Sequence, residues 1–523
     1  MSSLAALSNR DWDIIVVGGG ITGAGILREA ARLGLKALLL ERNDFASGTS
    51  SHSSKLIHGG LRYIAQGQVR LMRESVHARS QLLRDGAPLV KPLGYLHSIY
   101  KRDHMTPFIF EMGIRAYALL HGHLKVHERL KPSDVALNLP GLSEMNLAAV
   151  YAFDESSTDD ARLVLRVIRE ATDCGASALN YTPVVGLVRD EHGQVTGVLA
   201  SDADRGEPIR LNARVVVNAT GAWADTLRRQ IEAPARLRPM RGSHLVIPGW
   251  RFRLGQIASF FHHENGRPIY CVPWKGVVLV GTTDVDQGLL SDEIEPRPSA
   301  EEIHFLVGGL QARFPTLNFT LQDIQCVFAG LRPVADVHTS DPTKASREHV
   351  VIDESNLVTV AGGKLTTFHT MAVDVLEKLR TRFPNIPMHR AETSALDPLL
   401  ALPANLPLDS NLALDWLSRY GETGVDFLSA APADERNLLH NRHCASLSDL
   451  RWVARTEQVR HLDDLLLRRT RMGLILPKGG SALLPRICPV VQEELNWTDN
   501  RWDIEVERYL AHWEKIYAVP DQI

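Results

Sequence analysis

The stretch that decides the fold is DWDIIVVGGGITGAGILREAARLGLKALLLE, residues 11–41. An apolar, β-branched run, 11–17, leads directly into GGGITG, 18–23, which has the pattern G-x-G-x-x-G. A helical pattern and a second apolar run follow, and that run ends at Glu41. Such glycines let a pyrophosphate approach a helix N-terminus, and an acidic residue after the next strand accepts hydrogen bonds from a ribose. The stretch therefore predicts a dinucleotide-binding βαβ unit rather than a purely structural turn.

The length and composition of the chain exclude several classes of protein. A chain of 523 residues is long enough for two or three domains. The formal net charge of −3 gives no basic surplus, so we expect no nucleic-acid partner. The five cysteines are scattered and never form C-x-x-C, which is typical of a reducing compartment. We expect neither a disulfide framework nor a metal site.

Apolar runs bear on localisation. The first residues, MSSLAALSNRDWD, hold no apolar segment of signal-peptide type. No apolar run approaches the ~20 residues that a membrane span needs. We expect a cytoplasmic protein, with any membrane contact peripheral, on the cytoplasmic face of the inner membrane. Two segments are candidates for that contact: the basic run RRTR, 468–471, which more often indicates a salt-bridged helix end, and the region 91–131.

The segment after Glu41 is dense in Ser, Thr and Gly and leads into KLIHGGLRY, 55–63. A flexible linker would not place two cations, a His, paired glycines and a Tyr in nine residues. We interpret the segment as a loop that wraps a cofactor. Two later segments, ATG (219–221) and GGK (362–364), each follow a predicted strand, where cofactor oxygens can be bound. The residues predicted to contact the cofactor are Gly18, Gly20, Gly23, Glu41, Arg42, Thr49, Ser50, Ser54, His58, Gly59, Gly60, Ala219, Gly221, Gly362, Gly363, Lys364 and Thr366.

A single nucleotide fingerprint favours a resident cofactor. An enzyme that passes electrons from NAD(P)H to a flavin usually needs two such sites, whereas FAD stays bound, here non-covalently, while small substrates come and go. The predicted fold is an α/β Rossmann-like FAD-binding domain with an inserted antiparallel-sheet substrate domain, plus an all-α C-terminal domain. We assign 10–90, 150–235 and 335–385 to the FAD-binding domain, 91–149 and 236–334 to the substrate-binding region, 386–408 to a linker and 409–523 to the C-terminal domain. Residues 153–176 are predicted to be a loop followed by a helix.

Five segments together resemble one family. They are GTSSHSSKLIHGGLRY (48–63), FAGLRP (328–333), SREH (346–349), AGGKLTTF (361–368) and LLLRRTRMG (465–473). They closely resemble the FAD-dependent, quinone-linked (aerobic) glycerol-3-phosphate dehydrogenase family over most of the chain. The resemblance implies oxidation of sn-glycerol 3-phosphate to dihydroxyacetone phosphate, with hydride passing to FAD and electrons then to a quinone. A homodimer is compatible with it.

Three other functions stay open at this point. A glycerol-3-phosphate oxidase would keep the fold and substrate but pass electrons to oxygen. Amine and D-amino-acid oxidases share the N-terminal fingerprint but lack this set of arginines. A flavin-binding sensor without enzymatic activity is the most distant alternative.

The resemblance also implies roles for cations and histidines. A phosphorylated polyol needs guanidinium groups, which bind phosphate bidentately. By resemblance, Arg332 and Arg347 hold the phosphate, while Arg62, Tyr63 and Lys364 face the substrate near the flavin. The candidate bases are His244, which we favour, and His58, because His titrates near neutral pH. The predicted catalytic residues are His244, His58, Lys364 and Arg62.

Overall fold

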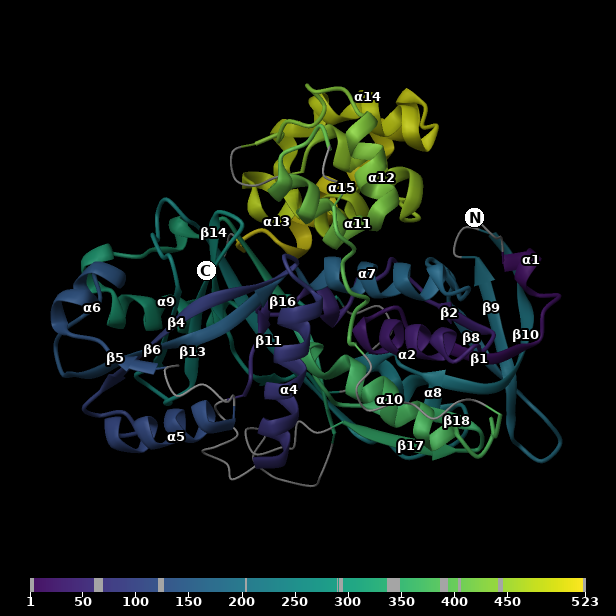
Figure 1. Ribbon diagram of the computed structural model, residues 1–523, viewed down its shortest axis with the longest axis horizontal. Helices are drawn as coiled ribbons and strands as arrows, with labels where there is room; N and C mark the ends of the chain where they lie inside the picture. Colours follow the sequence, from purple (N-terminus) through teal and green to yellow (C-terminus); the bar gives the residue numbers. More distant parts are fainter. Residues whose placement is uncertain are drawn as a thin grey trace.

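The computed structural model describes most of the chain (Figure 1). The described residues are 4–60, 69–120, 127–202, 205–288, 290, 295–335, 349–385, 394–402, 406–440 and 445–520. They form two β-sheets that lie side by side, with a group of helices across the top of the view.

The first sheet contains the predicted βαβ unit. Its strands are β1 (Trp12–Val17), β2 (Ala37–Leu40), β7 (Ser177–Leu179), β8 (Val184–Arg189), β9 (Val195–Asp202), β10 (Arg205–Asn218), β17 (Val350–Glu354) and β18 (Leu357–Ala361). Their order is β17-β18-β10-β1-β2-β7, and β10, β1, β2 and β7 are mutually parallel. The run predicted at 11–17 forms β1, whose apolar side chains are buried on both faces, as expected for a central parallel strand. The fold prediction is confirmed for this part.

Three helices cover this sheet and fix its core. They are α2 (Ile21–Arg32), α7 (Asp160–Asp173) and α10 (Phe368–Leu379). Both α7 and α10 pack against α2, and the three lie side by side in Figure 1. Asp159 caps α7 by accepting a hydrogen bond from the Arg162 backbone N–H. The helix that carries the dinucleotide fingerprint is thus held on both flanks.

The second sheet is largely antiparallel. Its strands are β3 (Leu56–Ile57), β4 (Val90–Tyr100), β5 (His127–Arg129), β6 (Leu147–Thr158), β11 (Leu237–Pro248), β12 (Ile257–Phe261), β13 (Pro268–Trp274), β14 (Val277–Gly281), β15 (Val285–Asp286) and β16 (Cys326–Ala335). Their order is β15-β11-β14-β13-β12-β4-β6-β3, with β16 beside β11 and β5 beside β6. The helices α5 (Pro107–Leu120), α6 (Pro132–Asn138) and α9 (Ala300–Arg313) belong to the same half of the molecule, whereas α4 (Val69–Asp85) lies between the two sheets with Leu82 in the core of the first.

One predicted loop is a strand. Residues 153–158 were expected to precede a helix as a loop, but they form the end of β6, paired with β4. The sequence did not predict this strand because its residues are polar, and polar residues such as Glu155 and Ser156 are seldom buried. Here both are buried. Arg79 compensates both, with its Nε 3.4 Å from the Glu155 carboxylate and 3.1 Å from Ser156 Oγ.

The C-terminal helices share an apolar core with the second sheet. They are α11 (Ser410–Ala430), α12 (Leu447–Thr456), α13 (Met472–Ile475), α14 (Leu484–Leu495) and α15 (Asp499–Ile516). Trp416, Tyr420 and Trp513 belong to one buried cluster with Phe153 and Phe328 of the sheet. The Val327 backbone N–H also donates to the Tyr517 carbonyl at 2.8 Å. These helices are therefore fixed against the sheet. No described helix is long and apolar enough to cross a bilayer.

The RRTR segment is buried, which overturns its candidacy as a lipid-binding surface. Its residues expose between 1% and 7% of their surface. Asp44, in the loop after β2, accepts hydrogen bonds from the guanidinium groups of both Arg468 and Arg469. Arg471 donates to Asp159 at 2.9 Å and also pairs with Asp160. The segment joins the C-terminal helices to the first sheet.

Arg471→Ala is expected to lower the free energy of unfolding by about 3–5 kcal/mol, because it leaves two buried carboxylates with one cation fewer. Burial opposes ionisation of Asp159, but Arg471 and Lys275 outweigh it and hold the pKa of Asp159 far below its usual range. This stabilisation is fully present above the unfolded pKa of about 3.9 and is lost progressively as pH falls from there towards the much lower folded pKa. Urea unfolding at pH 7 and at about pH 2 measures both effects.

The control is Arg115→Ala, whose side chain is 63% exposed and pairs with Glu111 one helical turn away. A surface pair of this kind contributes about 0–1 kcal/mol. Equal losses in the two variants would contradict a structural role for the buried network.

Candidate active site

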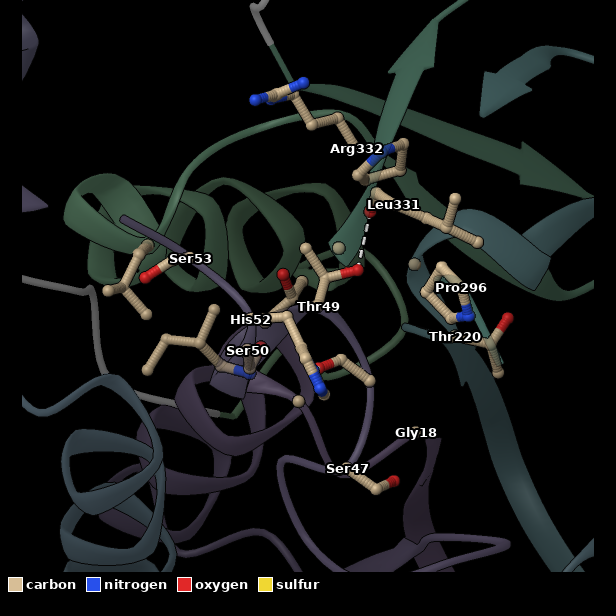
Figure 2. A pocket seen from close by; sticks show the side chains of 18 of the residues that line it. Gly18, Ser47, Thr49, Ser50, His52, Ser53, Thr220, Pro296, Leu331 and Arg332 are labelled. Atoms are coloured by element: carbon tan, nitrogen blue, oxygen red, sulfur yellow. Dashed lines mark hydrogen bonds between the residues drawn. The ribbon is translucent and has the colours of Figure 1, made fainter. Parts of the chain in front are cut away.

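A cavity of about 1180 Å³ lies where the two sheets and the C-terminal helices meet. Its lining comes from the β1–α2 turn, the loop between β2 and β3, the ends of β10 and β18, and strands β11 and β16. In Figure 2, Gly18 and Ser47 lie at one end of the view and Arg332 at the other, with Thr49 and His52 between them. The cavity therefore joins the predicted cofactor region to the predicted substrate region.

The β1–α2 turn forms a cradle that only glycine permits. Gly18 has φ +111°, and a Cβ there would lie 2.6 Å from the Ala219 carbonyl oxygen. A Cβ on Gly23 would lie 1.9 Å from the Gly18 carbonyl oxygen, so helix and strand approach as closely as backbones allow. This leaves the N-terminus of α2 open to the cavity, as a dinucleotide pyrophosphate requires.

Glu41 closes the same turn. Its carboxylate accepts hydrogen bonds from the backbone N–H groups of Gly19 at 2.6 Å and Asn43 at 2.9 Å. Burial raises the pKa of Glu41, while those two N–H groups act in the opposite direction. The side chain lines the cavity at the end of β2, where a ribose-binding acid is expected.

The loop between β2 and β3 (residues 42–55, the cofactor loop) is firmly held. Thr49 donates to the Leu331 carbonyl at 2.6 Å, a bond drawn in Figure 2, and Ser50 accepts from the Ile21 backbone N–H at 2.9 Å. Lys55 is buried and donates to Asp160 at 2.8 Å. The loop is therefore an ordered wall of the cavity rather than a linker.

His244 lies on β11 with its ring at the cavity wall. Its Nε2 is 2.8 Å from Ser54 Oγ, and the ring stacks on Phe328 with centroids 4.7 Å apart. Burial, followed by the positive charges of Arg332 and Lys55 and a smaller effect of His52, lowers the pKa of His244 well below 6.5. The imidazole is thus neutral at physiological pH and can accept a proton. His58, the second candidate base, is half-buried and also lines the cavity.

Arg332 belongs to a cluster of charges at the cavity wall. Its guanidinium donates to Asp284 at 2.9 Å and to Thr282 Oγ1 at 2.7 Å. Asp284 also pairs with Arg267 at 3.1 Å, so one buried carboxylate holds two guanidinium groups. The pair is preorganised for an anion because the directions of both side chains are already fixed.

Lys364 reaches the cavity from the other sheet. It caps the short turn before α10, and its Nζ donates to Ser75 Oγ at 3.1 Å. Lys364 is half-buried and lines the cavity, as does Thr366 in the same turn. Cations from both sheets therefore border the same space.

The cavity brings together most of the predicted site residues. Those that line it are Gly18, Gly20, Glu41, Arg42, Thr49, Ser50, Ser54, His58, Gly60, Ala219, Gly221, His244, Arg332, Gly362, Gly363, Lys364 and Thr366. Gly23 and Gly59 do not line it, but Gly23 shapes the cradle and the Gly59 N–H donates to Glu155 at 3.2 Å. Arg62, Tyr63 and Arg347 lie outside the described residues.

Sequence reasoning missed many lining residues, among them Tyr95, Trp223, Arg267 and Tyr270. Arg267 is the one with a usable signal, since it stands between a glycine and a proline at the start of β13. Among the described residues, no group of three or more His, Cys, Asp or Glu is arranged to hold a metal ion.

Comparison with known proteins agrees with this geometry. Residues 13–372 match the family described as "FAD dependent oxidoreductase", and residues 373–502 match "C-terminal domain of alpha-glycerophosphate oxidase". The glycerol-3-phosphate dehydrogenase 2 of Mycobacterium tuberculosis is 34% identical over 99% of this chain and 91% of its own length. The chain belongs to the FAD-dependent glycerol-3-phosphate dehydrogenase family.

Further comparisons agree with the assignment or with the fold. The aerobic glycerol-3-phosphate dehydrogenase of Staphylococcus haemolyticus is 35% identical over 72% of this chain and 68% of its own length. The solved glycerol-3-phosphate dehydrogenase of Bacillus halodurans, complexed with FAD, is 26% identical with a TM-score of 0.77 and covers 99% of this chain and 97% of its own. An L-alpha-glycerophosphate oxidase from Mycoplasma pneumoniae shares the fold, at 17% identity and a TM-score of 0.58 over 75% of this chain and all of its own.

FAD is the cofactor of this family, and the site fits it. The glycine cradle, the open helix N-terminus and Glu41 match what the pyrophosphate and ribose of a dinucleotide need. The cavity continues from there past the cofactor loop to His244 and Arg332, which leaves a place for a small substrate beyond the cofactor.

Proposed function

We propose that the protein oxidises sn-glycerol 3-phosphate to dihydroxyacetone phosphate, with non-covalently bound FAD as hydride acceptor and a quinone as final electron acceptor. One observation carries this proposal. The cavity that contains the dinucleotide cradle also contains a neutral, buried imidazole, His244, and preorganised guanidinium groups, among them that of Arg332. The names of the full-length relatives support the same substrate.

Arg332 and Arg347 hold the substrate phosphate in this proposal. Arg332 presents a guanidinium that Asp284 already orients, and Arg267 brings a second one beside it. Guanidinium groups match phosphate oxygens in charge and geometry. Arg347 keeps its predicted role, although it lies outside the described residues. The phosphate anchors the substrate and so places its C2 carbon.

The remaining residues act around C2. His244 takes the proton of the 2-hydroxyl group, and His58 is the alternative base. Arg62, Tyr63 and Lys364 face the substrate near the flavin, and the ammonium of Lys364 favours negative charge that develops there. FAD, when bound, supplies the chemistry of hydride acceptance, which no protein side chain provides.

The acceptor we propose is a quinone rather than oxygen. Two relatives named as dehydrogenases match the chain at 34–35% identity, and one of them over nearly its whole length. The oxidase structure matches at 17% identity. A quinone dissolved in the bilayer requires contact with a membrane surface, in keeping with a cytoplasmic protein attached to the inner membrane.

We propose the exposed face of α5 as that contact. Phe108 is 74% exposed, and Ile109 and Met112 are each 56% exposed on the same face. Lys101 and Arg102, just before the helix, are exposed as well. Apolar side chains beside basic ones fit the surface of an anionic bilayer. Of the two candidate segments, the RRTR segment is buried. Within the other, 91–131, we propose α5 as the membrane contact.

Glycerol 3-phosphate should bleach the flavin absorbance of the purified protein under nitrogen, and a quinone analogue should restore it faster than oxygen does. Stopped-flow absorbance measures both steps. Faster recovery with oxygen would make the protein an oxidase. Bleaching by an amino acid in place of glycerol 3-phosphate would assign it to the amine and amino-acid oxidases, and no bleaching by either would favour a sensor.

Arg332→Ala should raise KM for glycerol 3-phosphate by at least about 30-fold, because truncating one partner of a desolvated charge pair costs about 2–5 kcal/mol. Arg347→Ala should do the same. Steady-state kinetics on variants with an unchanged flavin spectrum test this. Arg253→Ala is the control, since Arg253 is exposed and does not line the cavity. An unchanged KM in both test variants would remove the two arginines from the phosphate site.

Phe108→Ser combined with Met112→Ser should weaken binding to anionic vesicles by about tenfold or more, because burying each apolar side chain contributes about 1.5–3 kcal/mol. Co-sedimentation with phosphatidylglycerol vesicles measures the binding. Leu137→Ser is the control, since Leu137 is 81% exposed on a different helix, α6. Equal binding by the double variant and the unchanged protein would exclude α5 as the contact.

A further inference from the structure

Ser54 and His244 form a hydrogen-bonded pair at the cavity wall. Ser54 Oγ lies 2.8 Å from His244 Nε2, although the two residues are 190 positions apart in the chain. Ser54 is half-buried and lines the cavity, whereas His244 exposes only 3% of its surface. The serine hydroxyl is therefore the more accessible member of the pair.

The remaining edges of the His244 ring are closed. Nδ1 is buried and has no hydrogen-bond partner among the described residues. One face of the ring stacks on Phe328, with the two planes only 9° apart. Another edge lies against Gly281, where a Cβ would come within 2.4 Å of His244 Cδ2. Within the described part of the chain, Nε2 is thus the ring nitrogen that has a hydrogen-bond partner, and that partner is Ser54.

We propose that Ser54 is a catalytic residue that carries the proton from the substrate to His244, an inference that rests on the proposed function. The 2-hydroxyl O–H bond of the substrate breaks as its proton bonds to Ser54 Oγ, and the proton that Ser54 held moves to His244 Nε2. The hydride leaves C2 with its electron pair for FAD, so the alcohol becomes a ketone. Ser54 ends as a hydroxyl, and His244 gains one proton and one positive charge.

The charges around the pair suit this direction of transfer. Burial above all, then Arg332 from β16 and Lys55 and His52 from the cofactor loop, lowers the pKa of His244 and keeps the free imidazole neutral. The relay uses the tautomer with its proton on Nδ1, in which Nε2 accepts the hydrogen bond of Ser54. Asp160 and Asp284 pair with Lys55 and Arg332 and moderate their effect. A substrate phosphate beside Arg332 adds negative charge, which favours the imidazolium at the moment it forms. The resting site is ready to accept a proton, and the bound substrate makes acceptance easier.

Ser54→Ala is expected to lower the rate constant for anaerobic flavin bleaching by glycerol 3-phosphate at least about tenfold, because a positioned proton acceptor contributes about 10²–10⁴-fold. KM should not change, and the rate is measured at saturating FAD because Ser54 is also a predicted cofactor contact. Ser54→Thr keeps the hydroxyl and should retain most of the rate. His244→Gln should slow the reaction similarly, and the double variant should be no slower than the slower single variant.

Ser51→Ala is the matched control. Ser51 lies in the same loop, but its hydroxyl is 3.0 Å from His52 Nδ1 and it does not line the cavity, so its loss should leave the rate unchanged. A wild-type rate in Ser54→Ala or additive losses in the double variant would each overturn the relay. If glycerol 3-phosphate fails to bleach the unaltered protein, the proposed function itself fails, which is a separate outcome.

Discussion

The buried carboxylate of Asp44 is the interaction on which the arrangement of this molecule depends. It is fully inaccessible to solvent and accepts hydrogen bonds from Arg468, Arg469 and the side-chain amide of Asn180. Removing such charges from water costs several kcal/mol per ion, and the cost is offset only when every partner is in place. The cofactor loop, the first sheet and the C-terminal helices must therefore pack together in one fixed arrangement. A second buried network, formed by Lys55, Asp160 and Arg471, ties down the other end of the same loop.

Fixing the cofactor loop also sets the distance between cofactor and substrate regions. Its middle is bonded to β16 through Thr49 and the Leu331 carbonyl, one residue before Arg332. Strand β16 pairs with β11 so that Phe328 lies opposite His244. The glycine cradle, the imidazole and the guanidinium thus come from three distant parts of the chain but share one rigid wall. Electrostatic effects on catalysis depend on such preorganisation, because groups that are already oriented need not reorganise during the reaction.

Local sequence patterns predicted local structure well. They did not predict which buried charged residues would be paired with residues far away in the chain. The fingerprint and the helix after it are readable because their period, glycines and acidic residue all lie within 11–41. The end of β6 was missed because the partner that makes Glu155 compatible with burial, Arg79, lies 76 residues away in the chain. The RRTR segment was ambiguous for the same reason, since three of its carboxylate partners, Asp44, Asp159 and Asp160, precede it by more than 300 residues. Arg267 was overlooked because only the fold places it beside Asp284.

Arg332 links substrate binding to the state of the base. Burial, and after it the Arg332 guanidinium, opposes protonation of the His244 imidazole, which keeps the ring neutral in the resting protein. The same guanidinium is the group that we propose to bind the substrate phosphate, whose negative charge would offset that opposition. Asp284 pairs with Arg332 and so fixes the direction of its side chain. Asp284 also pairs with Arg267, which keeps a second positive charge nearby. A substrate without an anionic group would leave the imidazolium disfavoured, so selection for a phosphorylated alcohol would extend from affinity to the proton transfer itself.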